Sequence, residues 1–186
     1  MTGVAPVVYA PSGRAIDLLD PDALMVDFRD VAAALSKICR FSGHTQSHYS
    51  VAQHSVHVSE LAAAASADLF PDDREVWRTA LYALLHDAAE AYTGDVTTPV
   101  KAALRALEIA AGGDGKSLSN LAAAIDRAIF TAAGLPPVMP ERIAALVHAA
   151  DRVAVATEWR DLMVSPPPAI EALPDPDRKR IRPLSW

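Results

Sequence analysis

The sequence predicts an all-α fold, and three observations support this. Alanine, the strongest helix former, accounts for 37 of the 186 residues. Aromatic side chains make up only 6% of the chain, whereas a β-sandwich requires many aromatic and β-branched residues. Apolar residues recur three and four positions apart, which is the spacing of one face of a helix. We therefore expect a single domain of packed helices, with at most a short β arm at the N-terminus.

Turn-forming residues divide the chain into the elements that we expect. Val7, Val8 and Tyr9 follow Pro6 and precede a Pro-Ser-Gly turn, which predicts a short β-like arm. Apolar spacing predicts helices over 27–39, 51–66, 73–92, 99–111, 117–133 and 141–163, with a polar loop over 41–50. The sequence thus predicts an N-terminal arm (1–26), a helical domain (27–165) and a C-terminal tail (166–186).

The predicted tail has an unusual composition. It contains six prolines, which favour an extended chain, and a basic stretch over 178–182. We expect this basic stretch to be solvated or to dock on a neighbouring subunit. The tail and the alanine-rich helix faces are also the basis for expecting a homo-oligomer, a dimer or larger.

Charge and composition argue against several classes of protein. A net charge of −6 argues against binding of nucleic-acid polymers, whose phosphates require an excess of Lys and Arg. No uncharged apolar run reaches the ~18 residues of a membrane span, and we expect no signal peptide. The single cysteine, Cys39, excludes an internal disulfide framework and fits a reducing compartment, so we expect a cytoplasmic protein.

The most informative polar residues lie in the predicted helix over 73–92. His86 and Asp87 follow an apolar run rich in alanine and leucine, where a charged aspartate is rarely buried without a partner or a metal. Glu90 lies four residues after His86 and three after Asp87, so a continuous helix would place all three along one edge. A solvated polar stripe on an amphipathic helix would explain the same pattern.

Two further polar residues lie among apolar neighbours. His54 belongs to the predicted helix over 51–66 and Asp151 to the one over 141–163. Each of them alone is explained by a helix cap or an exposed position. Together with His86 and Asp87, they supply two imidazoles and two carboxylates from three helices, a ligand set for one divalent ion with positions left for water and substrate. Mixed nitrogen and oxygen ligands favour Co, Mn, Zn, Fe or Ni over Ca or Mg.

This pattern resembles that of the HD-domain metal-dependent phosphohydrolases. The sequence from His86 to Lys101, HDAAEAYTGDVTTPVK, is similar to the signature of the small bacterial HD-domain 5′-deoxynucleotidases. The segments ICRF at 38–41 and VAQHS at 51–55 are similar to the segments of the same group that hold its arginine and first histidine. The likeness covers about residues 30–160.

The resemblance implies one divalent metal held by His54, His86, Asp87 and Asp151. It also implies an enzyme that hydrolyses a small nucleotide, most simply a 5′-(deoxy)nucleoside monophosphate, to nucleoside and phosphate through attack of metal-bound water.

The same resemblance assigns roles to three other residues. Glu90 would position or deprotonate the attacking water, and Arg40 would bind the phosphate. Asp95 would lie beside the phosphate or the sugar.

The sequence also departs from those nucleotidases. They carry tryptophan directly after the arginine, at a position that faces the sugar, whereas this chain has Phe41. The loop over 43–49 resembles another branch, common in phages and prophages, of a wider family that includes enzymes removing triphosphate from dNTPs. His44, His48 and Lys101 would then serve a longer phosphate chain, or they are polar surface residues.

Two alternatives to the nucleotidase hypothesis follow. The first is a deoxynucleoside triphosphate triphosphohydrolase of the dATPase kind, which releases tripolyphosphate. The second is a non-catalytic nucleotide-sensing module, against which the presence of the ligands, Glu90 and Arg40 argues.

Overall fold

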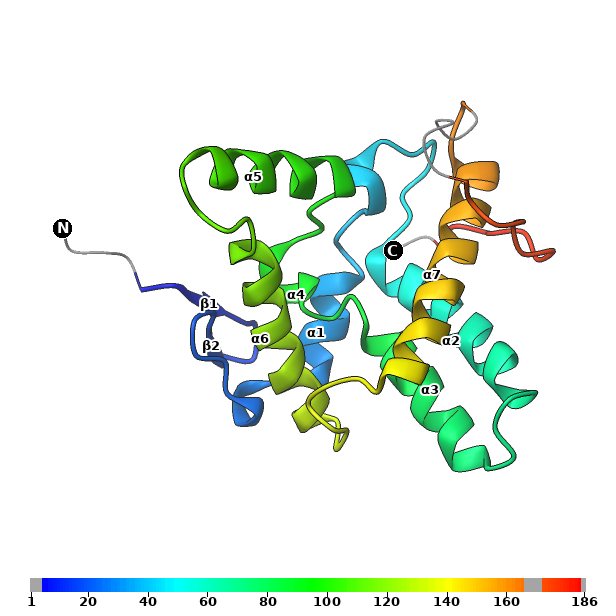
Figure 1. Ribbon diagram of the computed structural model, residues 1–186, viewed down its shortest axis with the longest axis horizontal. Coiled ribbons are helices and arrows are strands. Elements are labelled where there is room, and N and C mark those ends of the chain that lie inside the picture. Colours follow the sequence, from blue (N-terminus) through cyan, green and yellow to red (C-terminus); the bar gives the residue numbers. More distant parts are fainter. Residues whose placement is uncertain (1–4, 166–171, 185–186) are drawn as a thin grey trace. The chain divides into compact units, whose positions relative to one another are not determined.

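Helices dominate the computed structural model, which describes residues 5–165 and 172–184 (Figure 1). The α-helices are α1 (Phe28–Leu35), α2 (Val51–Ala67), α3 (Asp73–Leu85), α4 (Glu90–Thr93), α5 (Thr98–Ala110), α6 (Ser117–Ala132) and α7 (Glu141–Leu162). Short 3-10 helices, η1 (Ala23–Met25) and η2 (Arg40–Gly43), precede α1 and α2. The predicted all-α fold is confirmed, because the described residues form only one small sheet, at the N-terminal end.

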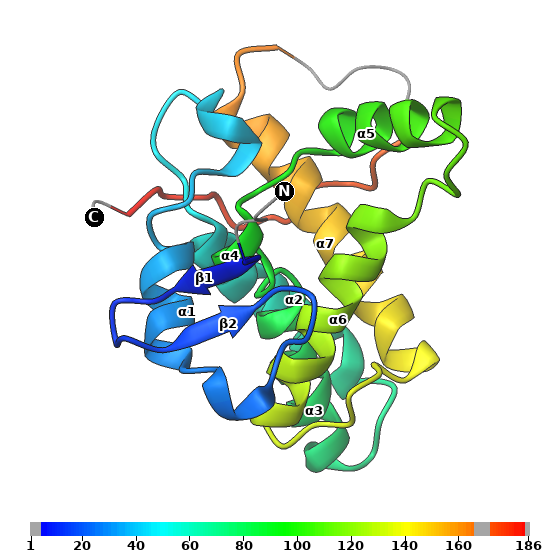
Figure 2. The same ribbon diagram turned by 90° about the vertical axis from the view of Figure 1, so that its left-hand side faces the viewer.

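That sheet is a hairpin of strands β1 (Val7–Tyr9) and β2 (Ala15–Asp17), which lie side by side in Figure 2. The strands are antiparallel, with Val7 opposite Asp17 and Tyr9 opposite Ala15. Gly13 has a φ of 87° in the connecting turn, a conformation that glycine adopts without strain. The apolar run of β1 predicts an extended arm. Strand β2 was not predicted, because its residues form no comparable apolar run.

Two predicted helices end earlier than expected. The chain leaves α1 at Leu35 and turns, and Cys39, which is extended, then forms an antiparallel bridge with Ser50 that closes the loop over 40–49. The predicted helix over 73–92 is wrong as one element, since α3 ends at Leu85 and a turn over 86–89 separates it from α4.

The chain divides into two compact units, and each is formed from two stretches of sequence. The first unit takes the chain up to Leu35 and then Ala88–Val138, and the second takes Ser36–Asp87 and the chain from Met139 onward. In the first unit, α4 packs against α1, and α6 packs against η1. Its buried apolar residues include Ile16, Val31, Ile125 and Ile129.

The second unit is built around α2, α3 and α7, which pack on one another (Figure 1). Each of these helices contributes a fully buried alanine: Ala62, Ala83 and Ala154. Side chains this small let helix backbones approach closely, which explains why so alanine-rich a sequence packs well with few aromatic residues. In α2 the buried stripe also contains Val58 and, one turn before it, His54.

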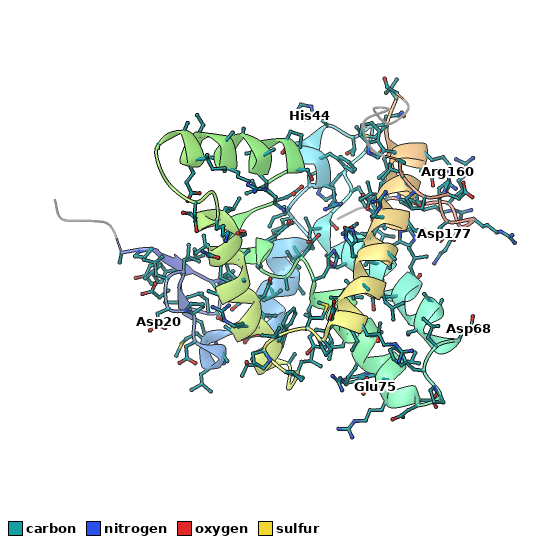
Figure 3. The ribbon with its side chains drawn as sticks, in the orientation of Figure 1. Asp20, His44, Asp68, Glu75, Arg160 and Asp177 are labelled. Atoms are coloured by element: carbon teal, nitrogen blue, oxygen red, sulfur yellow. The ribbon has the colours of Figure 1, made fainter. Side chains whose placement is uncertain are left out.

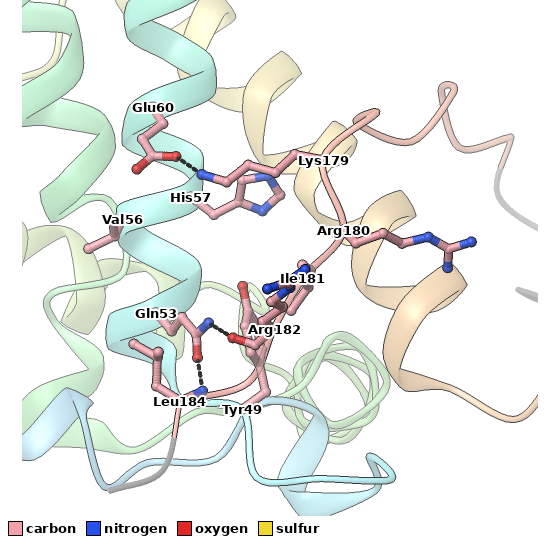
Figure 4. Close-up of a pocket in the computed structure, with 10 residues that line it drawn as sticks. All are labelled: Tyr49, Gln53, Val56, His57, Glu60, Lys179, Arg180, Ile181, Arg182 and Leu184. Carbon is pink, nitrogen blue, oxygen red and sulfur yellow. Dashed lines mark hydrogen bonds and ion pairs between the residues drawn. The ribbon is translucent and has the colours of Figure 1, made fainter.

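Residues 177–184, here called the tail segment, dock on α2 and α7 of the same unit (Figures 3 and 4). Arg160 of α7 donates hydrogen bonds to the backbone carbonyls of Asp177 and Lys179, and His57 of α2 contacts the Asp177 carboxylate at 3.2 Å. The basic side chains of this stretch are exposed, in keeping with the expectation of a solvated stretch, and two of them also find partners within the chain, Lys179 with Glu60 and Arg180 with Asp161. Docking on a neighbouring subunit stays a prediction. Residues 166–171 and 185–186 of the predicted tail lie outside the described residues.

The far end of the tail segment is held by one glutamine of α2. Gln53 donates its amide N–H to the carbonyl of Arg182 at 2.7 Å and accepts the backbone N–H of Leu184 at 3.1 Å (Figure 4). An ion pair of 2.9 Å between Lys179 and Glu60 adds a second link to α2, and a pocket lies between this helix and the tail segment. Gln53 thus pairs with the tail backbone as a neighbouring strand would.

Asp161 of α7 is a buried anchor of the tail segment. Its side chain is 4% exposed and accepts hydrogen bonds from Arg160, from Arg180 and from the backbone N–H of Ile181. The hydrogen bond from Arg160 lowers the pKa of Asp161 to about 2 although burial opposes this shift.

We expect Asp161→Ala to lower the free energy of unfolding by about 1.5–3 kcal/mol, the cost of losing hydrogen bonds to a charged group. Because the folded pKa is below the ordinary value of 3.8, the contribution is present above that pH and disappears as the pH falls toward 2. Urea denaturation at pH 7 and at pH 3 measures both effects. The matched control is Glu60→Ala, which removes an exposed ion pair to the same segment and should change the unfolding free energy little. Equal losses for the two variants would contradict the role of Asp161.

Candidate metal centre

Four side chains of the second unit converge on one point. His54 comes from α2, His86 and Asp87 follow α3, and Asp151 comes from α7. The Nε2 atom of His54 lies 3.4 Å from Nε2 of His86, 3.5 Å from Oδ2 of Asp87 and 3.3 Å from Oδ1 of Asp151. His86 Nε2 lies 3.3 Å from the Asp87 oxygen and 3.9 Å from the Asp151 oxygen. The structure therefore brings together all four predicted metal ligands.

These distances suit a shared ion. Ligand atoms ~2.0–2.2 Å from a tetrahedral ion stand about 3.3–3.6 Å apart. The contacts from His54 Nε2 fall within this range, and those from His86 Nε2 extend to 3.9 Å. His54, His86 and Asp87 each offer one ligand atom, all within 4.8 Å of one another.

The turn after α3 explains how two consecutive residues can reach the same point. Side chains at positions i and i+1 of a continuous helix diverge, so His86 and Asp87 could not both face one ion there. The helix instead ends at Leu85, with His86 as its C-cap, and the turn brings His86 Nε2 to 3.3 Å from Asp87 Oδ2. The expectation that both residues and Glu90 share one helical edge is therefore wrong.

The ring orientation of His86 is fixed by the end of α3. Its Nδ1 lies 2.7 Å from the backbone carbonyl oxygen of Ala83, one of the last carbonyls of the helix. A carbonyl can only accept, so Nδ1 carries the proton and donates it. In the neutral ring, Nε2 is then left with a lone pair directed at the cluster, as a metal ligand requires.

His54 is fixed by a buried glutamate. Its side chain is fully buried, and its Nδ1 lies 2.6 Å from Oε1 of Glu158, which is also fully buried. Burial and the charge of Arg40 would lower the pKa of His54, but the negative charge of Glu158 and the hydrogen bonds to Asp151 and Glu158 raise it to about 9. The pocket around this ring therefore attracts a cation, which can be a proton or a metal ion.

Arg40 of η2 lies between two carboxylates. Its Nη1 is 3.5 Å from Oδ2 of Asp87, and its Nη2 is 3.3 Å from Oε2 of Glu158. Burial raises the pKa of both carboxyl groups, but the histidines of the cluster and Arg40 more than offset this, so both pKa values are lowered and both groups are ionised. A guanidinium group therefore stands next to the candidate ion site, where it can bind an anionic substrate.

Glu158 was not predicted from the sequence. The signal that could have found it is its spacing, since it follows Asp151 by seven residues on α7, two helical turns along the same face. A glutamate at a buried helix position is also unusual enough to indicate a partner.

The predicted substrate residues of this unit lie in the loop after Arg40. Phe41 has a φ of 55° and packs edge-on against Trp159, with ring centroids 5.9 Å apart. A positive φ is unusual for a bulky residue and marks a strained position next to the candidate site. His44 is exposed (Figure 3) and His48 is half-buried.

Glu90, Asp95 and Lys101 belong to the first unit. Glu90 is buried at the start of α4, Asp95 follows Gly94 in the loop after that helix, and Lys101 is exposed on α5. Their roles at the cluster stay predictions.

The donor set therefore fits a divalent ion. Two imidazole nitrogens face two carboxylate oxygens, and each imidazole is oriented from behind by an acceptor, as is usual for metal-bound histidine. An all-helical fold with a His-Asp pair that meets a second histidine and a distant aspartate defines the HD-domain class of metal-dependent phosphohydrolases.

Comparison with known proteins identifies the family within that class. A family model described as 5′-deoxynucleotidase YfbR-like matches residues 27–158, so this chain belongs to the YfbR-like 5′-deoxynucleotidase family. The family confirms the resemblance drawn from the sequence. The protein is therefore a nucleotide phosphohydrolase of a metal-dependent class.

Two relatives extend the likeness beyond the matched region. An uncharacterized protein of Rhodobacter capsulatus is 40% identical over 149 residues, which cover 79% of this chain and 68% of the relative. The uncharacterized protein YfdR of Escherichia coli K12 is 35% identical over 172 residues, 91% of this chain and 80% of the relative. Among the described residues, none of the helices combines the length and apolarity needed to span a membrane.

Proposed function

We propose that this protein hydrolyses 5′-(deoxy)nucleoside monophosphates to nucleoside and phosphate in the cytoplasm. The observation that carries this proposal is the guanidinium of Arg40, 3.5 Å from Asp87, next to a cluster suited to a divalent ion. A cation site beside an arginine favours a phosphate group at the junction of the two.

His54, His86, Asp87 and Asp151 would hold one divalent transition metal, Co, Mn, Zn, Fe or Ni. When bound, such an ion activates water and offsets the negative charge of the phosphoryl oxygens. The chain contributes the geometry, because Ala83 and Glu158 orient the two imidazoles before any ion binds.

The remaining roles fall to four other side chains. Arg40 binds phosphate oxygens, and Glu90 orients the attacking water and accepts its proton. The water oxygen forms a new bond to phosphorus, the bond from phosphorus to the sugar oxygen breaks, and the sugar oxygen takes up a proton. Asp95 lies beside the phosphate or sugar, and Phe41 faces the sugar.

A product analysis tests the substrate class. We expect the metal-loaded protein to release inorganic phosphate and deoxyadenosine from dAMP. Release of intact tripolyphosphate from dATP, with dAMP left unchanged, would instead establish the triphosphohydrolase alternative, in which His44, His48 and Lys101 serve the longer phosphate chain. Nucleotide binding without turnover with any of several divalent metals would establish a sensing module. The expected homo-oligomer stays a prediction that size-exclusion chromatography with light scattering can test.

Metal binding should release protons, because a metal ion must replace the proton on His54. With a pKa of about 9, this imidazole is protonated in the metal-free protein at pH 7. We expect release of about one proton per ion at pH 7, and an apparent metal affinity that falls about tenfold for each pH unit below 9. Calorimetric titration with Mn²⁺ in buffers of different ionisation enthalpy measures the protons directly. A binding heat that does not depend on the buffer would contradict this prediction.

A further inference from the structure

In the proposed reaction Glu158 only orients His54, yet it is the fully buried carboxylate next to the site. It lies on α7, and both of its oxygens have partners in the second unit. Oε1 accepts a hydrogen bond from Nδ1 of His54 at 2.6 Å, and Oε2 accepts one from Nη2 of Arg40 at 3.3 Å. A buried carboxylate is tolerated only where such bonds replace its hydration.

The two partners of Glu158 have different tasks. His54 is a proposed metal ligand. Because Glu158 accepts a hydrogen bond from its Nδ1, the lone pair of the neutral ring lies on Nε2, where the ion would bind. Arg40 is the proposed phosphate-binding residue, and its other end lies 3.5 Å from Asp87, another proposed ligand. The contacts form a continuous series from His54 through Glu158 and Arg40 to Asp87. The orientation of the histidine and that of the arginine therefore depend on the same carboxylate.

We propose that Glu158 is a positioning residue that couples metal binding at His54 to phosphate binding at Arg40. This inference rests on the proposed function, since it requires that these residues bind a metal and a phosphate. An ion bound at Nε2 makes the Nδ1–H of His54 a stronger donor to Oε1 than it is in the neutral, metal-free ring, which fixes the carboxylate and, with it, Arg40. By linkage, phosphate bound to Arg40 must strengthen metal binding by the same factor.

The substitution Glu158→Gln tests this coupling with little change of volume. An amide has one oxygen and one NH₂ group, so it can accept from His54 or from Arg40 but not from both. If the oxygen faces His54, the NH₂ group opposes the guanidinium. If the oxygen faces Arg40, the NH₂ group opposes Nδ1 and forces the proton of the neutral ring onto Nε2. Either arrangement breaks one link of the series.

The experiment is a titration with Mn²⁺ alone, repeated in saturating inorganic phosphate. In the wild-type protein we expect phosphate to raise the Mn²⁺ affinity by about 5–150-fold, the usual range of coupling between two sites. In Glu158→Gln we expect the affinity for Mn²⁺ alone to fall by about 10–100-fold, as for the loss of other groups that orient metal ligands. In this variant, the ratio of the Mn²⁺ affinity with phosphate to the Mn²⁺ affinity without it should fall to near one.

Two further variants separate positioning from folding. Thr157→Val removes the neighbouring buried hydroxyl of α7, which bonds Val153 and the tail segment, and should leave both Mn²⁺ affinities unchanged. Glu158→Asp keeps two acceptor oxygens on a shorter side chain and should restore part of the coupling. If Glu158→Gln does not fold, Glu158→Asp alone decides, since a coupling factor equal to that of the wild type would overturn the proposal.

The outcomes also distinguish this inference from the proposed function. A wild-type protein that binds no Mn²⁺, or that binds it and hydrolyses no nucleotide, contradicts the proposed function. A wild-type protein that behaves as expected, beside a Glu158→Gln variant with an unchanged coupling factor, contradicts the inference alone.

Discussion

Replacing Asp87 by alanine should abolish tight metal binding and nearly all activity. Asp87 contributes a carboxylate oxygen within 3.5 Å of both cluster histidines, and its loss leaves an incomplete ligand set. Loss of a residue that only hydrogen-bonds to a metal ligand typically costs ~10–100-fold in activity. Because Asp87 is itself a proposed ligand, we expect kcat/KM to fall by more than this. Measuring the metal content of the purified variant, together with its nucleotidase activity, checks both parts of the prediction.

Asp177→Ala is the matched control for this variant. Asp177 also pairs with a histidine, His57 of α2, at 3.2 Å, a distance close to that between Asp87 and His86. It belongs to the tail segment and lies outside the cluster, so its loss should leave the metal content unchanged. An Asp87→Ala variant that retains one tightly bound ion and wild-type turnover would refute the metal centre.

Replacing Glu90 by glutamine should produce a different defect. The variant keeps the size of this buried side chain but removes its ability to accept a proton. We expect kcat to fall by about 10²–10⁴-fold, the usual contribution of a general base, while the metal content stays the same. Steady-state kinetics with dAMP and metal analysis of the same preparation test the assignment.

Glu75→Gln provides the comparison for Glu90. Glu75 lies in the first turn of α3, where it forms an ion pair with Arg78 at 2.8 Å, so its loss should leave kcat unchanged. If Glu90→Gln loses the bound ion, Glu90 is a ligand rather than a base. If it keeps full turnover, the proposed mechanism is wrong.

The ligand candidates show how much of the site the sequence carries. His54, His86, Asp87 and Asp151 each stand out because a polar residue interrupts an apolar helical pattern, and the structure brings all four together. The likeness around His86–Lys101 then identified the family, which the comparison confirmed. Glu158 does not stand out in the same way, because its importance depends on a contact with His54, 104 residues away.

The end of α3 shows the opposite case. Apolar residues continue through Leu84 and Leu85 to Ala88 and Ala89, so local spacing favours one helix over 73–92. Helical propensity is a weak preference of a fraction of a kcal/mol per residue, and tertiary contacts override it. Here the turn after Leu85 directs both His86 and Asp87 to the cluster, where they meet His54 of α2.

The helical class, most helix positions, the candidate ligands and the family could all be predicted from the amino-acid sequence. Each of these depends on residue types and on spacings of a few residues, which a helix converts directly into shared faces. The end of α3, the contacts of the tail segment and the buried carboxylate that orients His54 became visible only in the folded chain. These features depend on pairs such as Arg180 with Asp161 and His54 with Glu158. Their contacts form only after chain segments far apart in sequence have folded together, and no local pattern encodes them.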